Sequence, residues 1–278
     1  KNRNVFSTCY MLSYLFWFKR NQENIYSKIK HCLFPKDYIR YLFTGKINTD
    51  YSDASASGLY NFQENTWDKE IIEFLKCNEN IFPDIKKSSH YDILDEDSIF
   101  SNFFSEDTRI YTGMGDLPAV CYYNDIYSEN KALMNFGTGS QVAVSFPFES
   151  SEFRNTEKEL NRFIGVKPDQ ILYLGANLNS GVVINWLKQL FGVKNEEINE
   201  LLKKSSAGAG GLKFLPYLIG ERCPYFKPDL KGSLRGLTVD TDIEDIFRAA
   251  FEGILFNIKE AYSMLTNKNN INEIKLTG

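Results

Sequence analysis

A single aspartate stands at the end of a short apolar run, on a turn that contains two glycines. Asp116 follows Gly113-Met114-Gly115 and precedes Leu117-Pro118-Ala119-Val120. A carboxylate held beside a sugar hydroxyl can accept its proton, which is the task of a general base. Aspartate before a helix can also serve as an N-cap, because it accepts hydrogen bonds from the free amides of the first turn. Both interpretations stay open for Asp116 on these residues alone.

The second chemical feature is a Gly-Thr-Gly turn, about twenty residues farther along the chain. Gly137, Thr138 and Gly139 separate two apolar runs, residues 132–136 and 141–146. This pattern predicts a β-hairpin whose tip presents backbone N–H groups and a hydroxyl. Glycine at an ordinary hairpin tip, where it supplies a positive φ, is the alternative. A loop around phosphates and a carboxylate beside a hydroxyl are the two halves of a small-molecule kinase site.

Predicted strands and helices must position these two features. The run 109–112 predicts a strand before Asp116, and a proline in the first turn allows a helix after it. Farther along, short apolar runs predict strands at 171–174 and 274–276. Amphipathic spacing predicts helices at 182–191 and 196–204, and a long helix from Thr241 or Asp240 to about Leu265.

Upstream of Asp116 the chain is mostly helical by the same criterion. Apolar residues recur every three to four positions with lysines on the other face, which predicts helices over 9–19, 22–30 and 37–43. The third should stop at Thr44-Gly45. A further helix is predicted over 67–77, with Thr66 as its N-cap. The segment 48–60 is rich in Ser, Asp, Ala and Gly.

Composition limits the kinds of protein that this can be. With 278 residues, 43% of them hydrophobic and 15% aromatic, the chain can bury sizeable cores and is long enough for two lobes. A net charge of −4 disfavours nucleic acid as the main partner. The apolar run 9–18 is too short to span a bilayer and lacks the pattern of a signal peptide.

Cysteine and histidine offer little for metal or thiol chemistry. The five cysteines are scattered, odd in number and without a CxxC spacing, and there are only two histidines. This pattern indicates reduced thiols in a cytoplasm and gives no metal-ligand set. The protein is therefore predicted to be cytoplasmic, with neither a nucleic-acid nor a membrane partner.

Further motifs accompany the two features in a definite order along the chain. They are Lys36-Asp37-Tyr38-Ile39-Arg40, Thr49-Asp50-Tyr51-Ser52-Asp53-Ala54-Ser55, Asn179-Ser180-Gly181, Gly220-Glu221-Arg222-Cys223-Pro224, Glu252-Gly253 and Leu276-Thr277-Gly278. In this order, and together with Gly113–Asp116 and Gly137–Gly139, they resemble the FGGY family of carbohydrate kinases. The resemblance covers essentially the whole chain.

The resemblance implies a fold and a set of site residues. The fold is α/β, an actin-like ATPase (ribonuclease H-like) fold of two lobes, incomplete here, in which sugar and ATP meet in the cleft. Asp116 matches the catalytic base of the family. The nucleotide-binding positions that match are Gly137, Thr138 and Gly139 on the phosphate loop, Gly181, and Gly278 on the adenosine side. ATP and Mg²⁺ are the implied cofactors.

The chemistry of the residues agrees with this assignment. Phosphoryl transfer has a loose transition state, so a carboxylate near the attacking hydroxyl need only orient it and take its proton late. The Thr138 hydroxyl and the amides of the turn can stabilise charge on the γ-phosphoryl oxygens. The function predicted is transfer of that group to a primary hydroxyl of a ketose or a sugar acid.

The division into lobes and the extent of the chain are also predicted. Residues 1–128 are expected to form the remainder of the N-terminal sugar-binding lobe, and residues 129–278 a truncated C-terminal nucleotide-binding lobe. The boundary is placed in the polar segment 124–131. The chain begins without methionine and stops on a strand, so we expect a fragment that is inactive alone. The magnesium-binding aspartate of the family is expected upstream of Lys1.

The substrate is not fixed by these motifs. The Gly220–Pro224 motif and the segment 50–55 look most like xylulose and gluconate kinases, whereas the Gly-Thr-Gly turn also resembles the sedoheptulose branch. A sedoheptulose- or ribulose-type kinase is therefore the alternative within the family. A non-catalytic actin-like nucleotide-binding module is the alternative outside it. The partners expected are a small sugar and ATP, and a homodimer is left open.

Several other polar and aromatic residues are interpreted as structural. The segment 50–55 should supply turn and cap bonds near the cleft. Glu221 and Arg222 could contact the nucleotide, but the simpler expectation is an ion pair that braces the proline loop. Trp186 is expected in the core. Arg248 and Glu252, four residues apart on one helix, should pair with each other.

Overall fold

The protein consists of two compact units. The chain passes from the first unit to the second, returns once to the first, and ends in the second. The computed structural model describes residues 8–128, 130–148, 160–266 and 271–278. The first unit is formed by residues 1–127 and 145–172, and the second by 128–144 and 173–278. Strands β8 (Ser140–Pro147) and β10 (Gln170–Asn177) therefore each contribute residues to both units.

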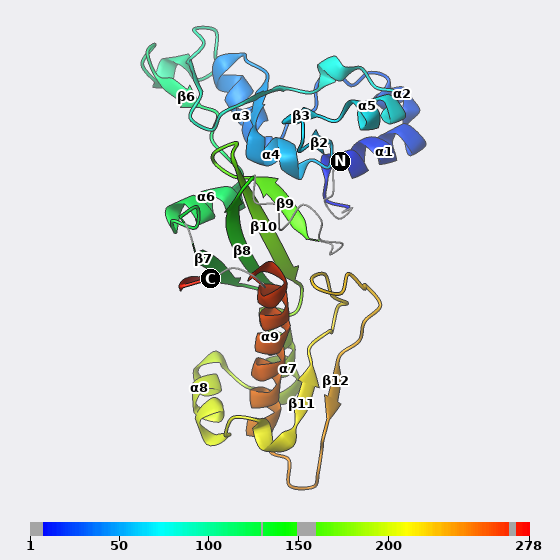
Figure 1. The fold of residues 1–278 in the computed structure, drawn as a ribbon, viewed down its shortest axis with the longest axis vertical. Helices are drawn as coiled ribbons and strands as arrows, with labels where there is room; N and C mark the ends of the chain where they lie inside the picture. Colours follow the sequence, from blue (N-terminus) through cyan, green and yellow to red (C-terminus); the bar gives the residue numbers. More distant parts are fainter. Residues whose placement is uncertain (1–7, 129, 149–159, 267–270) are drawn as a thin grey trace. The chain divides into compact units, whose positions relative to one another are not determined.

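The first unit is built from short helices and two-stranded ribbons (Figure 1). Strand β1 pairs with β4 in parallel, and β2 with β3 and β5 with β6 are antiparallel pairs. The helices are α1 (Met11–Asn21), α2 (Glu23–Tyr26), α3 (Pro35–Thr44), α4 (Tyr51–Ala56), α5 (Lys69–Leu75) and α6 (Asp116–Tyr123). The strands are β1 (Asn48–Asp50), β2 (Tyr60–Asn61), β3 (Thr66–Trp67), β4 (Asp84–Lys86), β5 (Tyr91–Ile93), β6 (Arg109–Tyr111) and β9 (Asn161–Ile164).

Local sequence signals set the ends of α3. Pro35 occupies its first turn, where the missing N–H costs nothing. Gly45 ends it in the left-handed conformation, at φ 62°, and donates its N–H to the Tyr41 carbonyl. The expected stop at Thr44-Gly45 is therefore confirmed, because glycine carries no Cβ that would oppose this conformation.

Two expectations for the first unit are wrong. The helix predicted over 22–30 is only Glu23–Tyr26. The helix predicted over 67–77 is Lys69–Leu75, and its N-cap is Asp68, which accepts from the N–H groups of Glu70 and Ile71. Thr66 lies instead in β3, because pairing of Trp67 with Tyr60 extends the backbone there. The segment 48–60 holds β1, α4 and the start of β2, and Asp50 caps α4.

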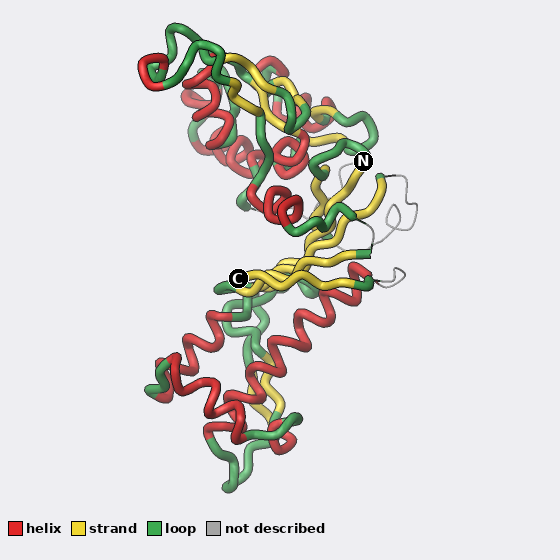
Figure 2. The backbone as a smooth tube through the Cα atoms, turned by 90° about the vertical axis from the view of Figure 1, so that its left-hand side faces the viewer, coloured by secondary structure: helices red, strands yellow, loops and turns green. Residues whose placement is uncertain are grey.

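In its described residues the second unit combines strands with three α-helices, which lie on one side of its sheet (Figure 2). Its strands run in the order β13-β7-β8-β10, and β9 continues this sheet beside β10. The helices are α7 (Gly181–Phe191), α8 (Asn195–Lys204) and α9 (Ile243–Thr266), and the strands not yet given are β7 (Lys131–Phe136), β11 (Lys213–Leu215), β12 (Ser233–Arg235) and β13 (Glu273–Thr277).

The hairpin predicted around the Gly-Thr-Gly turn is confirmed. Strands β7 and β8 are antiparallel, with Leu133 opposite Ala143 and Phe136 opposite Ser140. Strand β13 adds to β7 in parallel, so that Thr277 lies opposite Asn135. A parallel neighbour needs a long connection, and the helical segment between β10 and β13 supplies it. The turn and the chain after β13 therefore lie at the same end of the sheet.

The long predicted helix is also confirmed, as α9. Most of its buried residues recur every three to four positions, and α9 packs against α7, α8, β11 and the 3₁₀ turn Ala209–Gly211 (Figure 1). The buried apolar residues are Phe247, Ala249, Ala250, Ile254, Ile258, Ala261 and Leu265. The helix begins at Ile243, two residues after the expected cap Thr241, whose hydroxyl accepts from the Thr238 N–H instead. In the described parts of the chain no helix is both long and apolar enough to span a bilayer.

Candidate active site

Asp116 is the first residue of α6, at the end of a loop whose backbone is held on both sides. The N–H groups of Thr112 and Gly113 donate to the His90 and Ser88 carbonyls, at 2.8 and 3.1 Å. Gly113 has φ 72°, so the turn needs glycine there. Gly115 then donates its N–H to the Ser52 hydroxyl at 2.9 Å. The Asp116 carboxylate itself is exposed to solvent.

The N-cap of α6 is Gly115, so the interpretation of Asp116 as the cap is wrong by one position. Asp116 Oδ1 does accept one backbone bond, from the N–H of Leu117 at 2.6 Å. A carboxylate in a first helical turn also interacts favourably with the helix dipole, typically by 0.3–1 kcal/mol. Asp116 therefore has a modest structural role. Its second carboxylate oxygen, Oδ2, takes no part in the bond with the Leu117 N–H.

A buried charge cluster lies directly beside this loop. Lys36 Nζ is 2.5 Å from Asp37 Oδ1, 2.9 Å from Asp50 Oδ1 and 3.1 Å from Asp53 Oδ2. The side chains of Asp37 and Asp50 are fully buried. A Cβ added to Gly115 would come within 2.9 Å of Asp53 Oδ1, so the cluster reaches the residue before Asp116. Of the cap and turn chemistry expected for 50–55, the bond from the Ser52 N–H to Asp50 at 2.7 Å is confirmed.

The cluster shifts the pKa of its members. Burial opposes the charge of Lys36, but the carboxylates of Asp50, Asp53 and Asp37 outweigh it and raise the pKa of that ammonium. Burial raises the pKa of Asp53 to about 6, with help from Asp50 and Asp37 and against the attraction of Lys36. Burial likewise raises the pKa of Asp37, opposed by Lys36. Burial is the main reason why the pKa values of Asp37 and Asp53 are raised, and repulsion between neighbouring carboxylates adds to it.

This geometry predicts an unusual pH dependence of stability. Because the pKa of Asp53 is higher in the folded than in the unfolded protein, the folded state binds the extra proton between about pH 4 and 6. The contribution of Asp53 to stability should therefore fall as pH rises through this window and stay constant above it. We expect Asp53→Asn to remove this contribution. The check is the melting temperature of both full-length proteins from pH 4 to 7.

The difference between the two melting curves isolates Asp53 from other carboxyl groups. Asp92, for example, has a lowered pKa, because hydrogen bonds from Arg40 and Asn48 outweigh its burial. The contribution of Asp92 to stability therefore rises with pH, and it is the same in the wild type and in Asp53→Asn. A constant difference between wild type and Asp53→Asn across the window would contradict the prediction.

In the second unit, the Gly-Thr-Gly turn packs against the beginning of α7. The N–H groups of Gly181 and Val182 donate to the carbonyls of Gly137 and Thr138, both at 3.0 Å. In a trans peptide the N–H points opposite to the preceding carbonyl. The N–H groups of Thr138 and Gly139 therefore point away from α7. This orientation presents two amides of the turn to a ligand.

Close backbone approach leaves no space for a Cβ at three glycines in and around this turn, Gly139, Gly181 and Gly278. A Cβ on Gly181 would lie 2.6 Å from the Gly137 carbonyl oxygen, and one on Gly139 would lie 2.5 Å from that of Asn177. Gly278 follows β13, and a Cβ there would meet the Phe136 carbonyl oxygen at 2.0 Å. The interpretation of the turn as an ordinary hairpin tip does not account for these contacts from three separate segments.

A pocket of about 390 Å³ opens at this turn. Gly137, Thr138 and Gly139 line it on one side, and Arg222 contributes a cationic side chain. The remaining lining residues are Asn135, Ser140, Gln141, Ala176, Asn177, Leu178 and Ile219. Polar amides, a hydroxyl and a guanidinium suit an anionic ligand such as a phosphate chain.

Glu221 joins segments of the pocket wall by accepting hydrogen bonds, and it forms no ion pair with the Arg222 side chain. Its Oε1 accepts from the backbone N–H groups of Leu178 and Arg222, at 2.6 and 2.8 Å. Its Oε2 accepts from the side-chain amides of Asn179 and Asn257, at 3.1 and 2.7 Å. The expected Glu221–Arg222 ion pair is therefore wrong, because the carboxylate is 98% buried among these four donors.

Of two other structural expectations, the Arg248–Glu252 pair is confirmed and the burial of Trp186 is wrong. Arg248 and Glu252 do pair on α9, with Nε and Oε1 2.8 Å apart. Trp186 was expected in the core but is 41% exposed on α7, with its ring centroid 6.5 Å from that of Phe214. Val183 and Leu187 take the buried face of that helix.

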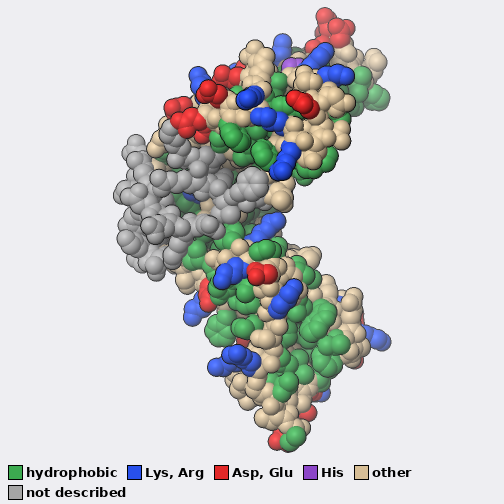
Figure 3. Space-filling model, turned by 90° about the vertical axis from the view of Figure 1, so that its right-hand side faces the viewer, with side chains coloured by type: hydrophobic (Ala, Val, Ile, Leu, Met, Phe, Trp, Pro, Cys, Tyr) green, Lys and Arg blue, Asp and Glu red, His purple; other side chains and the backbone are tan. Residues whose placement is uncertain are grey.

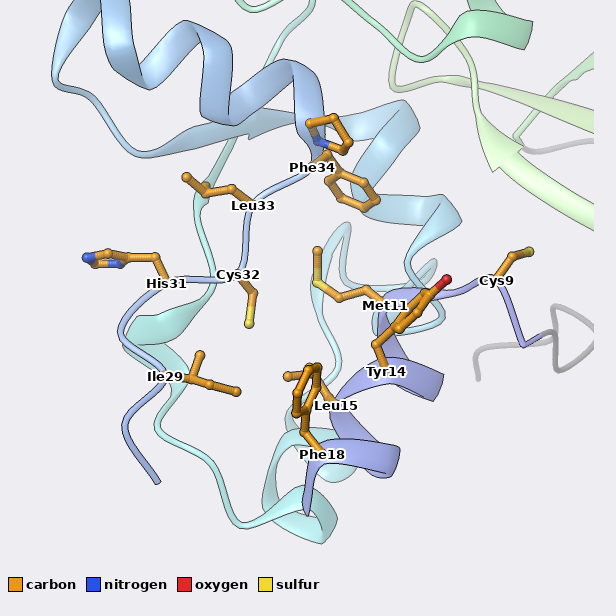
Figure 4. Close-up of a pocket in the computed structure, with 11 residues that line it drawn as sticks. Cys9, Met11, Tyr14, Leu15, Phe18, Ile29, His31, Cys32, Leu33 and Phe34 are labelled. Atoms are coloured by element: carbon orange, nitrogen blue, oxygen red, sulfur yellow. The ribbon is translucent and has the colours of Figure 1, made fainter. Parts of the chain in front are cut away.

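A second cavity, of about 420 Å³, has a different character (Figure 4). Leu15 and Phe18 of α1 face Ile29 and Cys32 across it, and the His31 side chain points away. Its walls offer few polar groups that could bind a sugar or a phosphate.

On the molecular face drawn in Figure 3, basic side chains are scattered among acidic and neutral ones. That face shows no basic surface of the kind that binds nucleic acid.

The predicted site residues thus fall into two groups. Asp116 belongs to the first unit, whereas Gly137, Thr138, Gly139, Gly181 and Gly278 come together at one end of the sheet in the second. The Lys36 cluster, the Ser52–Gly115 hydrogen bond and the hydrogen bonds of Glu221 were not predicted from the sequence. The Lys36-Asp37 and Asp50–Ser55 motifs were the available signal, but their spacing alone does not reveal that they meet.

Family models match both parts of the chain. The N-terminal domain of the FGGY family of carbohydrate kinases matches residues 1–121, and the C-terminal domain of the same family matches residues 132–278. The chain belongs to the FGGY family of carbohydrate kinases. The expected α/β, actin-like ATPase fold of the ribonuclease H-like type is confirmed with it.

Individual members of the family are similar over the whole chain. It is 33% identical over 275 residues to a xylulose kinase of Staphylococcus xylosus, which covers 97% of this chain and 56% of that protein. A ligand-bound xylulose kinase and a gluconate kinase of Lactobacillus acidophilus, both solved structures, superpose with a TM-score of 0.91, at 25% and 26% identity. Each alignment covers all of this chain and 57% of the solved one. The chain thus spans about half the length of these family members.

Proposed function

We propose that the full-length protein is an ATP- and magnesium-dependent sugar kinase that phosphorylates a primary hydroxyl of a ketose or a sugar acid. Asp116 is the general base of this reaction, and xylulose or gluconate is the substrate. The proposal follows from membership of the FGGY family and from similarity to proteins named xylulose kinase and gluconate kinase. In this proposal residues 1–128 bind the sugar and residues 129–278 bind the nucleotide.

The observation that carries the proposal is the placement of Asp116. Its carboxylate is exposed at the first residue of α6, and the backbone before it is fixed by hydrogen bonds to buried groups. Oδ1 is used by the Leu117 N–H, so Oδ2 is the atom that would accept the proton of the sugar hydroxyl. A carboxylate with one oxygen held and one open to a substrate has the geometry of a general base.

The second unit supplies groups that suit a nucleotide. The amides of Thr138 and Gly139 and the Thr138 hydroxyl would hold phosphate oxygens, and Arg222 would add a positive charge at the pocket wall. Gly181 and Gly278 would let the segments around the phosphate loop approach closely, since a Cβ at either position would meet a backbone carbonyl oxygen. When bound, ATP supplies the phosphoryl group. Among the residues described, no group of three or more metal-binding side chains occurs, and no residue is assigned to magnesium.

A substrate panel tests this function. ADP release by the full-length protein should be stimulated by xylulose or gluconate more than by ribulose, sedoheptulose or glycerol, with ATP and Mg²⁺ present throughout. Stimulation only by sedoheptulose or ribulose would move the substrate to another branch of the family. Nucleotide hydrolysis that no sugar accelerates would contradict the proposal and indicate a non-catalytic actin-like module.

A further inference from the structure

The hydroxyl of Ser52 links the loop before Asp116 to the buried charge cluster. Ser52 lies in α4 and is 98% buried. Its Oγ accepts the Gly115 N–H at 2.9 Å and donates its own proton to Asp50 Oδ2. Because the proton of Ser52 is committed to Asp50, a lone pair of the oxygen is left to face Gly115. Asp50 therefore sets the orientation of the Ser52 hydroxyl toward Gly115.

Asp50 is in turn held in place from two sides. Its Oδ2 accepts the Ser52 N–H at 2.7 Å, which caps α4, and its Oδ1 lies 2.9 Å from Lys36 Nζ. Strand β1, which Asp50 ends, pairs with β4, where Asp50 lies opposite Lys86. A fully buried carboxylate with an ion pair and two hydrogen bonds has little freedom to move.

Gly115 is the position where this network meets the candidate base. As the N-cap of α6 it has no side chain of its own to supply a cap. Its carbonyl accepts the Ala119 N–H at 3.0 Å, and its N–H is bound by Ser52. Both polar groups of Gly115 are thus held, which fixes the start of α6 and with it the Cα of Asp116.

We propose that Ser52, oriented by Asp50 and Lys36, is a positioning residue for Asp116. The proposal rests on the proposed function, in which Asp116 acts as the base. Ser52 touches neither the sugar nor the phosphoryl group in this scheme. It acts by holding the backbone that carries the carboxylate, and misplacement of a reacting group by about 1 Å can cost roughly 10²-fold in rate.

The test is Ser52→Ala in the full-length protein. We expect kcat to fall by about 10- to 100-fold while KM for ATP stays within about twofold, because the nucleotide side is not touched. Ser52→Cys fills the same space with a weak hydrogen-bonding group and should lose kcat similarly. Amide hydrogen exchange of Gly115, measured in the same variants, should become faster, which reports the hydrogen bond without using activity.

Ser57→Ala is the matched control. Ser57 is fully buried at the other end of α4, and its Oγ bonds locally, to the Ala54 carbonyl at 2.5 Å and the Leu59 N–H at 2.9 Å. Its loss should lower the melting temperature about as much as Ser52→Ala without changing kcat or the exchange of Gly115.

Two results would overturn the proposal, and they differ. If Asp116→Asn loses turnover but Ser52→Ala and Ser52→Cys behave like Ser57→Ala, the kinase assignment stands and the positioning role is wrong. If Asp116→Asn keeps its turnover, the assignment of the base is wrong, and the positioning role fails with it.

Discussion

Asp116→Asn in the full-length protein should lower sugar-dependent turnover by roughly 10²–10⁴-fold, the usual effect of removing a positioned general base. Asparagine keeps the size of the side chain and the acceptor that binds the Leu117 N–H at 2.6 Å, but it cannot take up the proton. Stability should change by no more than about 1 kcal/mol, since only a first-turn charge is lost. KM for ATP should change little. Steady-state ADP release and a melting curve measure all three quantities.

Two further variants separate catalysis from structure at this position. Asp107→Asn changes another surface aspartate of the same unit, whose partner is the Ser105 hydroxyl, and should leave kcat unchanged. Asp116→Ala should lose turnover like Asp116→Asn and also lose the Leu117 bond. If Asp116→Ala were destabilised but normally active, Asp116 would be a structural residue of α6 only.

Glu221→Ala should have the largest effect on stability, about 3–5 kcal/mol. The buried carboxylate accepts from two backbone and two side-chain donors, and its removal leaves all four inside the second unit without this acceptor. Each stranded donor costs about 1–3 kcal/mol, partly relieved by relaxation. The expected fall in melting temperature is about 10 °C, measured by thermal unfolding. KM for ATP should rise as well, because Leu178 and Arg222 line the pocket at the Gly-Thr-Gly turn.

Glu260→Ala is the control for this loss. Glu260 is an exposed carboxylate that accepts from the Tyr225 hydroxyl, so its removal should cost less than about 1 kcal/mol. Glu221→Gln keeps the volume but turns an NH₂ group toward N–H donors, and should lie between the two. Equal melting temperatures for Glu221→Ala and Glu260→Ala would show that the carboxylate does not hold this wall.

The amino-acid sequence by itself determined the elements whose signals are local. Apolar spacing gave α9, alternating apolar runs gave the β7–β8 hairpin, and Gly45 marked the end of α3. These predictions succeeded because period, turn chemistry and capping act between residues a few positions apart. The motif order also indicated the family. The roles of Asp116 and of the glycines at the nucleotide side stay predictions.

Tertiary structure alone decided the features that join distant segments. Pairing of Tyr60 with Trp67 turned an expected helix start into a strand and moved the cap to Asp68. Packing left Trp186 exposed although its residue type favours the core.

The two polar networks around the candidate site were likewise beyond local reasoning. Lys36 meets Asp53 across seventeen positions, and Glu221 meets Asn257 across thirty-six. A carboxylate or an ammonium can pair with many partners, and its spacing in sequence does not select one. The folded chain makes that selection, because a charge taken out of water must find its counter-charge or hydrogen-bond donors among whichever groups are buried beside it.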